Sequence, residues 1–207
     1  ANHIKRDTPV MCVIGNPPYS GESANKGEWI MSLMEDYKKE PGRKDKLNES
    51  NIKWVNNDYV KFLRFSQYLI DKNGEGVLAF ITSNSYIDSI TFRGIRFSLL
   101  NSFDKIYILD LNGNAEKLKV NSKGEKDENV FDIKEGVSII LAIKNKQHSN
   151  PLAILNYEEF IGKREDKYSK LLNNSLTSLS WKKIKYEKPD YFFYPISTNV
   201  NAYNNGI

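Results

Sequence analysis

The chain has 207 residues, with 30 Lys and Arg against 26 Asp and Glu, and a formal net charge of +4 at pH 7. This length allows one domain, or one domain with a small appendage, and the mild charge permits nucleic-acid binding without arguing for it. The single cysteine, Cys12, excludes an internal disulfide framework and fits a reducing cytoplasm; we expect it to pack inside the first strand.

Membrane and metal-binding proteins are not expected. The sequence contains neither a signal peptide nor an apolar run long enough to span a membrane, which predicts a cytoplasmic protein without a membrane partner. His3 and His148 have no Cys or His partners at metal-binding spacing, so we expect no metal site.

The first predicted element is the apolar run at residues 10–15, which ends in a glycine. Such a run is typical of a buried strand in a parallel sheet. The tetrapeptide Asn16, Pro17, Pro18, Tyr19 follows directly. In open α/β sheets ligands bind just past the carboxyl ends of the strands, so the tetrapeptide occupies the place of an active-site loop.

The tetrapeptide has the chemistry to hold a planar amine. Its two prolines fix the backbone and remove two N–H donors, so the loop presents mainly carbonyl acceptors. The Asn16 side chain and the Pro17 carbonyl can each accept one N–H of the amine, which frees the nitrogen lone pair for attack on an electrophile. Tyr19 can stack on the ring, a contact worth about 1–3 kcal/mol per base. The alternative is an ordinary turn, because Asn-Pro and Pro-Pro are common in loops.

The tetrapeptide resembles the catalytic motif of amino-group methyltransferases, above all the adenine-N6 DNA methyltransferases. The wider pattern is similar to the methylase part of large restriction-modification polypeptides. The resemblance implies S-adenosylmethionine as cofactor, double-stranded DNA as partner, and Asn16, Pro17, Pro18 and Tyr19 as catalytic residues. It covers most of residues 8–195 and continues through residues 76–86, 91–100, 105–114 and 129–143.

Residues 20–50 follow the tetrapeptide and are rich in Gly, Lys, Glu, Asn and Asp. Apolar side chains recur within them at helical spacing, and residues 38–49 are expected to form a solvated loop. A long segment directly after an active-site loop often forms a lid, and a disordered surface insertion is the equal alternative. The helical positions are Trp29, Ile30, Leu33, Met34 and Tyr37.

Asn51 is the expected N-cap of a long helix whose end is marked by Asn73 and Gly74. Residues 77–81 form the next expected strand. Together with residues 10–14, this helix and strand predict a right-handed βαβ unit.

A second helix is expected to begin at Thr91, its predicted cap. Arg93 and Arg96 are three residues apart and therefore share a face of this helix. They either contact the DNA backbone or pair with surface carboxylates, and the second alternative is slightly favoured. The inward positions are Phe92, Ile95, Leu99 and Leu100.

Two further strands are expected at residues 106–111 and 137–143, with a loop of mixed charge between them. Phe131 is a large aromatic residue in that loop. The resemblance implies that Phe131 closes the face of a flipped adenine opposite Tyr19. The equally weighted alternative is a hydrophobic plug beneath the loop.

Beyond residue 150 the pattern predicts a short strand at 152–157, a charged helix at 163–173 and a run of lysines and aromatics at 181–195. Such a run can bind single-stranded nucleic acid, but packing onto its own domain is the favoured interpretation. We divide the chain into residues 1–150, the C-terminal half of a methyltransferase core; residues 151–195, an appended strand, helix and aromatic-rich segment; and residues 196–207, a linker toward a missing domain.

The sequence departs from the resembled family in the cofactor-binding half, since no Gly-rich strand-to-helix loop is found and Asn16 alone would approach the cofactor. We therefore expect an α/β class, a partial Rossmann-like S-adenosylmethionine-dependent methyltransferase fold with its first three strands missing. Its sheet of four main strands is mostly parallel with an antiparallel final strand. The missing N-terminal half of the core is then a partner, and residues 10–14 form an exposed edge through which the fragment self-associates unless its own termini cover it.

The function expected from this resemblance is site-specific DNA adenine-N6 methylation within a restriction-modification enzyme, with the isolated fragment inactive. One alternative is a methyltransferase for another planar amine, such as guanine N2 in ribosomal RNA or a glutamine side chain in protein. The other is a non-catalytic DNA-binding module that keeps the fold. The long extension past the last core strand favours DNA over the first alternative, and the intact tetrapeptide argues against the second.

Overall fold

The computed structural model describes residues 8–19, 21, 23–117, 119–147 and 151–196. His3, His148 and residues 197–207, which include most of the predicted linker, lie outside these ranges. Within them, no helix is long and apolar enough to cross a membrane. The same part of the chain contains no group of three or more His, Cys, Asp or Glu side chains arranged to hold a metal ion.

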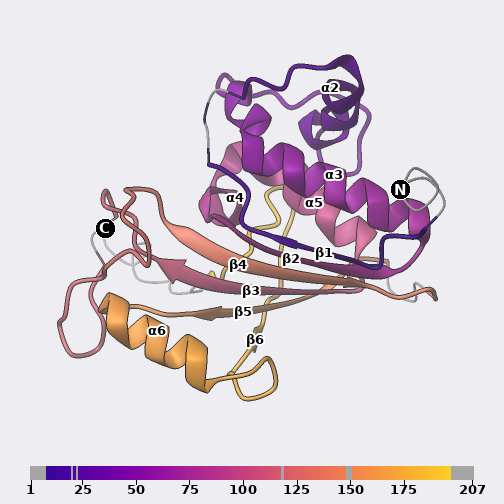
Figure 1. Ribbon diagram of the computed structural model, residues 1–207. Coiled ribbons are helices and arrows are strands. Elements are labelled where there is room, and N and C mark those ends of the chain that lie inside the picture. The colour runs from indigo at the N-terminus through magenta and orange to yellow at the C-terminus, as the bar shows by residue number, and fades with distance from the viewer. Residues whose placement is uncertain (1–7, 20, 22, 118, 148–150, 197–207) are drawn as a thin grey trace, which may run out of the picture.

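The described chain forms a six-stranded sheet in the order β1-β2-β4-β3-β5-β6 (Figure 1). β1, β2, β3 and β5 run in one direction, and β4 and β6 run in the other. This arrangement confirms the α/β class and the mostly parallel sheet, which has six strands instead of the expected four. The strands are β1 (Cys12–Gly15), β2 (Gly76–Ser83), β3 (Lys105–Asn112), β4 (Val137–Lys144), β5 (Ile154–Glu159) and β6 (Lys182–Lys183).

Helices cover both faces of the sheet, with α3 and α5 on one face and α6 on the other (Figure 1). The strands alternate accordingly, because successive side chains of a strand point to opposite faces. In β3, Ile106 and Ile108 enter the main apolar cluster, whereas Leu109 and Leu111 enter a second, smaller cluster. The helices are α2 (Glu28–Met34), α3 (Asp58–Asn73), α4 (Ser85–Asp88), α5 (Arg93–Ser102) and α6 (Arg164–Asn173), with short 3-10 turns η1 (Glu35–Lys38), η2 (Ile52–Asn56) and η3 (Ile90–Phe92).

The long helix begins later than the sequence suggests. Asn57 caps α3, since its side chain accepts a hydrogen bond from the Tyr59 N–H at 3.3 Å. Asn51 instead precedes the 3-10 turn η2, so the predicted cap is wrong. The end is confirmed, because Gly74 adopts a left-handed φ of 85° as the C-cap. β1 and β2 are parallel neighbours joined through α3, as the βαβ prediction requires.

The start of α5 also differs from the prediction. Thr91 lies within η3, and α5 begins at Arg93 without a side-chain cap, so Thr91 is not the helix cap. The four positions predicted to face inward are confirmed as buried. They are Phe92, Ile95, Leu99 and Leu100.

β1 lies at the edge of the sheet, as predicted, and among the described residues it pairs with β2 alone. Its side chains are not buried: Ile14 is 79% exposed, and Cys12 is also exposed. The expectations of a buried first strand and a packed Cys12 are therefore wrong for this chain. A strand becomes buried only where further elements cover it, and composition alone does not show whether they do.

Residues 39–49 are tied to α5 through Glu40 and Glu49, which both pair with Arg93. Residues 42–46 between them are exposed, as expected for a solvated loop. Lys39 and Lys46 form an isolated antiparallel bridge, and Leu47 is buried. Gly94 of α5 allows the close approach of η1 and the residue after it, since a Cβ there would lie 2.5 Å from the Tyr37 carbonyl oxygen and 2.7 Å from that of Lys39. The described residues that follow the tetrapeptide therefore contact α3 and α5 through a few buried side chains and keep a solvated stretch at residues 42–46.

The region beyond residue 150 continues the same sheet. β5 pairs in parallel with β3, and β6 pairs with β5, so two strands of the predicted appended segment extend the sheet. The aromatic run packs onto its own domain, as favoured: Phe193 is fully buried and its N–H donates to the Ile87 carbonyl at 3.0 Å.

Candidate functional site

The tetrapeptide follows β1 at the carboxyl end of the strand. Asn16 and Pro18 are exposed, Pro17 is buried and Tyr19 is half-buried. The Tyr19 hydroxyl donates a hydrogen bond to Asn16 Oδ1 at 3.1 Å. A carbonyl oxygen has two lone pairs, so this bond orients the Asn16 amide and leaves one acceptor position open.

Tyr19 packs edge-on against Tyr59 of α3, with ring centroids 6.2 Å apart and an interplanar angle of 84°. Burial raises the pKa of Tyr19 to about 12, and the negative charge of Glu135 adds to the shift. The hydroxyl therefore stays protonated at neutral pH and remains a donor to Asn16.

Phe131 lies in the loop between β3 and β4, and it packs against the same apolar cluster as Tyr19. Both rings are partly buried against the second apolar cluster. A local hydrogen bond holds the backbone at Phe131, whose N–H donates to Asn129 Oδ1 at 2.9 Å. The buried members of this cluster are Leu109, Leu111, Val130, Val137 and Phe160.

Asn84, directly after β2, is hydrogen-bonded to the residue that precedes β4. The Asn84 N–H donates to the Gly136 carbonyl at 2.9 Å, just before β4 begins. A Cβ at Gly136 would lie 2.6 Å from the Asn84 side-chain amide, so a larger residue there would displace that amide. Asn84 belongs to the polar turn that follows the predicted strand, and that turn is the only sequence signal for its role.

Asp110 near the end of β3 is a buried carboxyl group that no sequence pattern pointed to. It is 6% exposed and accepts from Asn84 Nδ2 at 3.0 Å, the Asn112 N–H at 2.9 Å and the Tyr157 hydroxyl at 3.3 Å. Burial raises the pKa of Asp110, and the hydrogen bond from Asn84 opposes that shift. An apolar strand ending in Asp is the available signal, but its side-chain partners Asn84 and Tyr157 come from distant parts of the chain.

Arg93 and Arg96 are both buried, which leaves little of either side chain exposed to contact a DNA backbone. Arg93 donates to Glu40 at 2.5–2.8 Å and also pairs with Glu49. These carboxylates raise the pKa of Arg93. Arg93 pairs with carboxylates, as the favoured alternative predicted. The pairs are not at the surface, however, because Arg93 is only 7% exposed.

Arg96 holds backbone carbonyls in the interior. It is fully buried and donates to the carbonyls of Tyr86, Ser89 and Asp190 at 2.7–2.8 Å. Burial lowers the pKa of Arg96 to about 10. The predicted contact of this side chain with a phosphate is therefore wrong, since its donors face α4 and the C-terminal segment.

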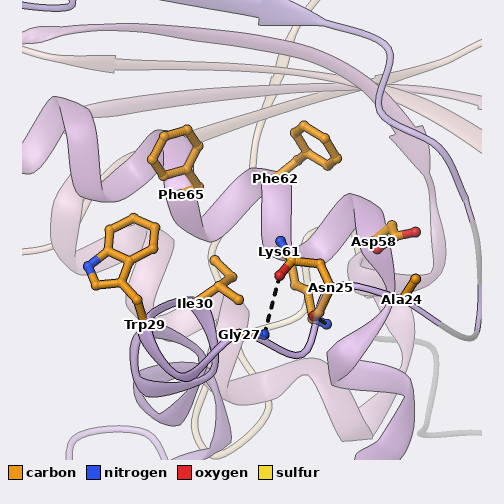
Figure 2. Close-up of a pocket in the computed structure, with 9 residues that line it drawn as sticks. All are labelled: Ala24, Asn25, Gly27, Trp29, Ile30, Asp58, Lys61, Phe62 and Phe65. Carbon is orange, nitrogen blue, oxygen red and sulfur yellow. Dashed lines mark hydrogen bonds between the residues drawn. The ribbon is translucent and has the colours of Figure 1, made fainter. Parts of the chain in front are cut away.

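An apolar pocket of about 600 Å³ lies between α3 and the segment that follows the tetrapeptide. Figure 2 shows the rings of Trp29, Phe62 and Phe65 around it. Lys61 donates to Ser23 Oγ at 2.8 Å and to the Asn25 carbonyl, and this holds the segment on α3. Lys61 therefore has a structural role, because its ammonium group bonds to the chain itself.

The tetrapeptide end of the sheet suits an amine better than S-adenosylmethionine. Such a cofactor carries a carboxylate and a ribose, which require N–H or cationic donors and a hydroxyl-binding carboxylate. The described tetrapeptide instead presents carbonyl oxygens and two prolines without N–H groups. These residues do not form a cofactor pocket by themselves.

Comparisons with known proteins show the family and the fold of the chain. A family model described as Eco57I restriction-modification methylase matches residues 4–117. No curated protein matches the chain. Among solved structures, the ATP-dependent Type ISP restriction-modification enzyme LlaBIII bound to DNA is 27% identical with a TM-score of 0.76, over 91% of this chain and 13% of that one.

Two other solved structures share the fold. The DrdV–DNA complex is 24% identical with a TM-score of 0.72, over 88% of this chain and 18% of that one. A nuclease-deletion mutant of the Type ISP restriction-modification enzyme LlaGI, in complex with a DNA substrate mimic, is 22% identical with a TM-score of 0.76, over 92% and 19% of the two chains. The chain thus spans less than a fifth of each of these proteins.

Proposed function

Because this chain belongs to the Eco57I restriction-modification methylase family, we propose that it carries the amine-binding half of a DNA adenine-N6 methyltransferase within a restriction-modification enzyme. The observation that carries the proposal is the tetrapeptide at the end of β1, with Asn16 oriented by Tyr19. The DNA-bound state of the three solved structures supports DNA as the partner.

Asn16 has the central role in the proposed mechanism. Its open Oδ1 lone pair and the Pro17 carbonyl accept the two N–H groups of the adenine amine. This hydrogen bonding draws both hydrogens toward the loop and leaves the nitrogen lone pair facing away from it. S-adenosylmethionine supplies the methyl group when bound, and within this chain only Asn16 is proposed to lie near it. The catalytic contribution of the tetrapeptide is therefore positioning.

Tyr19 and Phe131 would hold the base itself. The enzyme must rotate the adenine out of the duplex, at a cost of a few kcal/mol. Stacking on two aromatic rings can offset that cost, at about 1–3 kcal/mol per base. Both rings lie against the second apolar cluster, which supports a common site for them.

The test is methyl transfer by the full-length protein from S-adenosyl-[methyl-³H]methionine to unmethylated phage DNA, ribosomal RNA or a protein extract. We expect label in DNA, recovered as N6-methyladenine after digestion, and its loss in the Asn16→Ala variant. Label in RNA or protein would instead support a methyltransferase for another planar amine. DNA binding without transfer to any acceptor would support the non-catalytic module.

A further inference from the structure

Helix α6 reaches across to the loop that carries Phe131. Lys167 Nζ donates to the carbonyls of Leu111 at 2.7 Å and Glu128 at 2.5 Å. Arg164 donates to the carbonyls of Asn129 at 2.7 Å and Phe131 at 3.1 Å. The Tyr168 hydroxyl donates to the carbonyl of Val130. Every carbonyl from 128 to 131 therefore accepts a hydrogen bond from one helix.

The three donors share one face of α6, since they are spaced three and four residues apart. Lys167 is fully buried at 1% exposure and forms an ion pair with Asp127 at 2.6 Å. Asp127 in turn accepts from the Gly113 N–H at 2.6 Å and the Gly162 N–H at 2.9 Å. A buried ion pair contributes little net stability compared with apolar side chains of the same volume, so its value here lies in the geometry that it fixes.

We propose that Arg164, Lys167 and Tyr168 are positioning residues that set the height and direction of the Phe131 ring. This inference rests on the proposed function, in which Phe131 stacks on the extruded base. The loop is also fixed from within, because Asn129 Nδ2 donates to the carbonyls of Gly113 at 2.9 Å and Glu135 at 2.7 Å. Helix α6 holds the loop from outside through its hydrogen bonds to the loop carbonyls. It lies outside the residues that match the family model.

The chain offers a matched pair of substitutions for the test. Tyr168→Phe removes one hydroxyl that donates to a backbone carbonyl near Phe131. Tyr186→Phe is the control, since the Tyr186 hydroxyl donates to the Ala153 carbonyl at 2.8 Å, away from that loop. In the full-length protein, we expect Tyr168→Phe to lower kcat on unmethylated phage DNA about two- to tenfold without raising KM, and the control to change neither.

A double-mutant cycle tests whether the effect passes through the ring. In a Phe131→Ala background, Tyr168→Phe should change kcat no more than the control does, because the group that it positions is gone. An unchanged kcat in the Tyr168→Phe single variant, or an equal loss in the Phe131→Ala background, would overturn the proposal.

Hydrogen exchange separates this inference from the proposed function. Peptides that cover residues 128–136 should exchange about two- to tenfold faster in Tyr168→Phe than in Tyr186→Phe. If the wild-type protein transfers no methyl group to DNA, the proposed function fails and exchange alone decides the role of α6. Equal exchange in the two variants would show that α6 does not hold the loop.

Discussion

Asn16 and Tyr19 form a pair in which one side chain orients the other. The Tyr19 hydroxyl occupies one lone pair of Asn16 Oδ1 at 3.1 Å, and the amide stays exposed on its other side. An exposed asparagine would otherwise sample several rotamers, at a cost in entropy when a substrate binds. Asn16 is therefore preorganised by Tyr19 to bind an amine, which it would not be without that hydrogen bond.

Asn16→Ala should reduce methylation turnover about a hundred- to a thousandfold, while DNA affinity changes little, because the lost contact acts mainly in the transition state. Asn16→Asp should be partly tolerated, since a carboxylate also accepts the N–H. Steady-state kinetics and equilibrium binding on the full-length protein provide the measurements. Asn101→Ala, at an exposed position of α5, is the control. A parallel loss of affinity and turnover would instead assign Asn16 to DNA binding.

Tyr19→Phe keeps the ring and removes the hydroxyl that orients Asn16. We expect a two- to tenfold fall in kcat, about the value of one hydrogen bond. The wild-type pKa is raised to about 12, so the hydroxyl does not titrate between about pH 6 and pH 9. The ratio of the wild-type and variant rates should therefore be constant across that range. A ratio that falls toward one as the pH rises would mean that the hydroxyl ionises there.

At the scale of elements, the loop between β3 and β4 is the second half of the candidate site. Phe131→Ala and Tyr19→Ala should each weaken capture of the extruded base by about 1–3 kcal/mol, and the double variant should lose more than either single variant. The measurement is kcat/KM on unmethylated DNA. Ile133→Ala is the control, because Ile133 is an apolar residue of the same loop and is 39% exposed. Unchanged methylation with a lower Tm in Phe131→Ala would make Phe131 a plug.

The segment at residues 39–49 is attached to α5 through Arg93, and we expect this attachment to depend on pH. The Arg93 hydrogen bond holds the pKa of Glu40 below its ordinary value of 4.5. A carboxyl group whose pKa is lowered by folding stabilises the protein fully above its unfolded pKa and loses that effect as pH falls through the folded pKa. The attachment should therefore be complete at neutral pH and weaken in acid.

Glu40→Gln should lower Tm at neutral pH by about 2–4 °C. The difference from wild type should shrink as the pH falls below 4.5, because protonated Glu40 then resembles the variant. Thermal unfolding across this range measures the effect. Glu35→Gln is the control, since Glu35 is 47% exposed and pairs with Lys38 within one 3-10 turn. A difference that does not depend on pH would show that the Glu40 charge is not involved.

Periodicity located the strands and the buried faces of the helices, because burial repeats along the chain. It did not distinguish Asn51 from Asn57 as a cap, since both precede apolar residues and only the structure shows a 3-10 turn between them. The environment of Arg93 and Arg96 depended on partners as distant in sequence as Glu40 and Asp190. Such long-range contacts leave no local pattern in the sequence.

In the candidate site too, local patterns could be recognised in the sequence and long-range contacts could not. The tetrapeptide is contiguous, so its chemistry could be inferred from four residues. Phe131 was inferred by resemblance, whereas Asp110 and Lys167 were missed because a buried charge cannot be recognised without its partners. The composition of residues 10–15 predicted a buried strand, whereas the exposed edge was inferred from the expected absence of the first three strands. Composition alone does not decide, since a strand at the edge and a strand at the centre can have the same apolar residues.

At the scale of the whole molecule, the two edge strands of the described sheet are β6 and β1. β5 is followed by the short strand β6, but β1 has one described neighbour and displays Ile14 at 79% exposure, and Met11 directly before it is 48% exposed. An exposed apolar edge tends to pair with another strand. In the complete enzyme, we propose that this edge receives the cofactor-binding half of the core.

The isolated 207-residue chain should therefore associate through β1 as its concentration rises, which sedimentation velocity would detect. Ile14→Lys should shift it toward monomer, because a charged side chain on an edge strand opposes pairing. Leu172→Lys is the matched control: Leu172 is 85% exposed but lies on α6, away from the sheet edge. Association lost equally in both variants would indicate general apolar contact. A monomer at all concentrations, with freely exchanging amides at residues 12–15, would show that the edge has no affinity for a second strand.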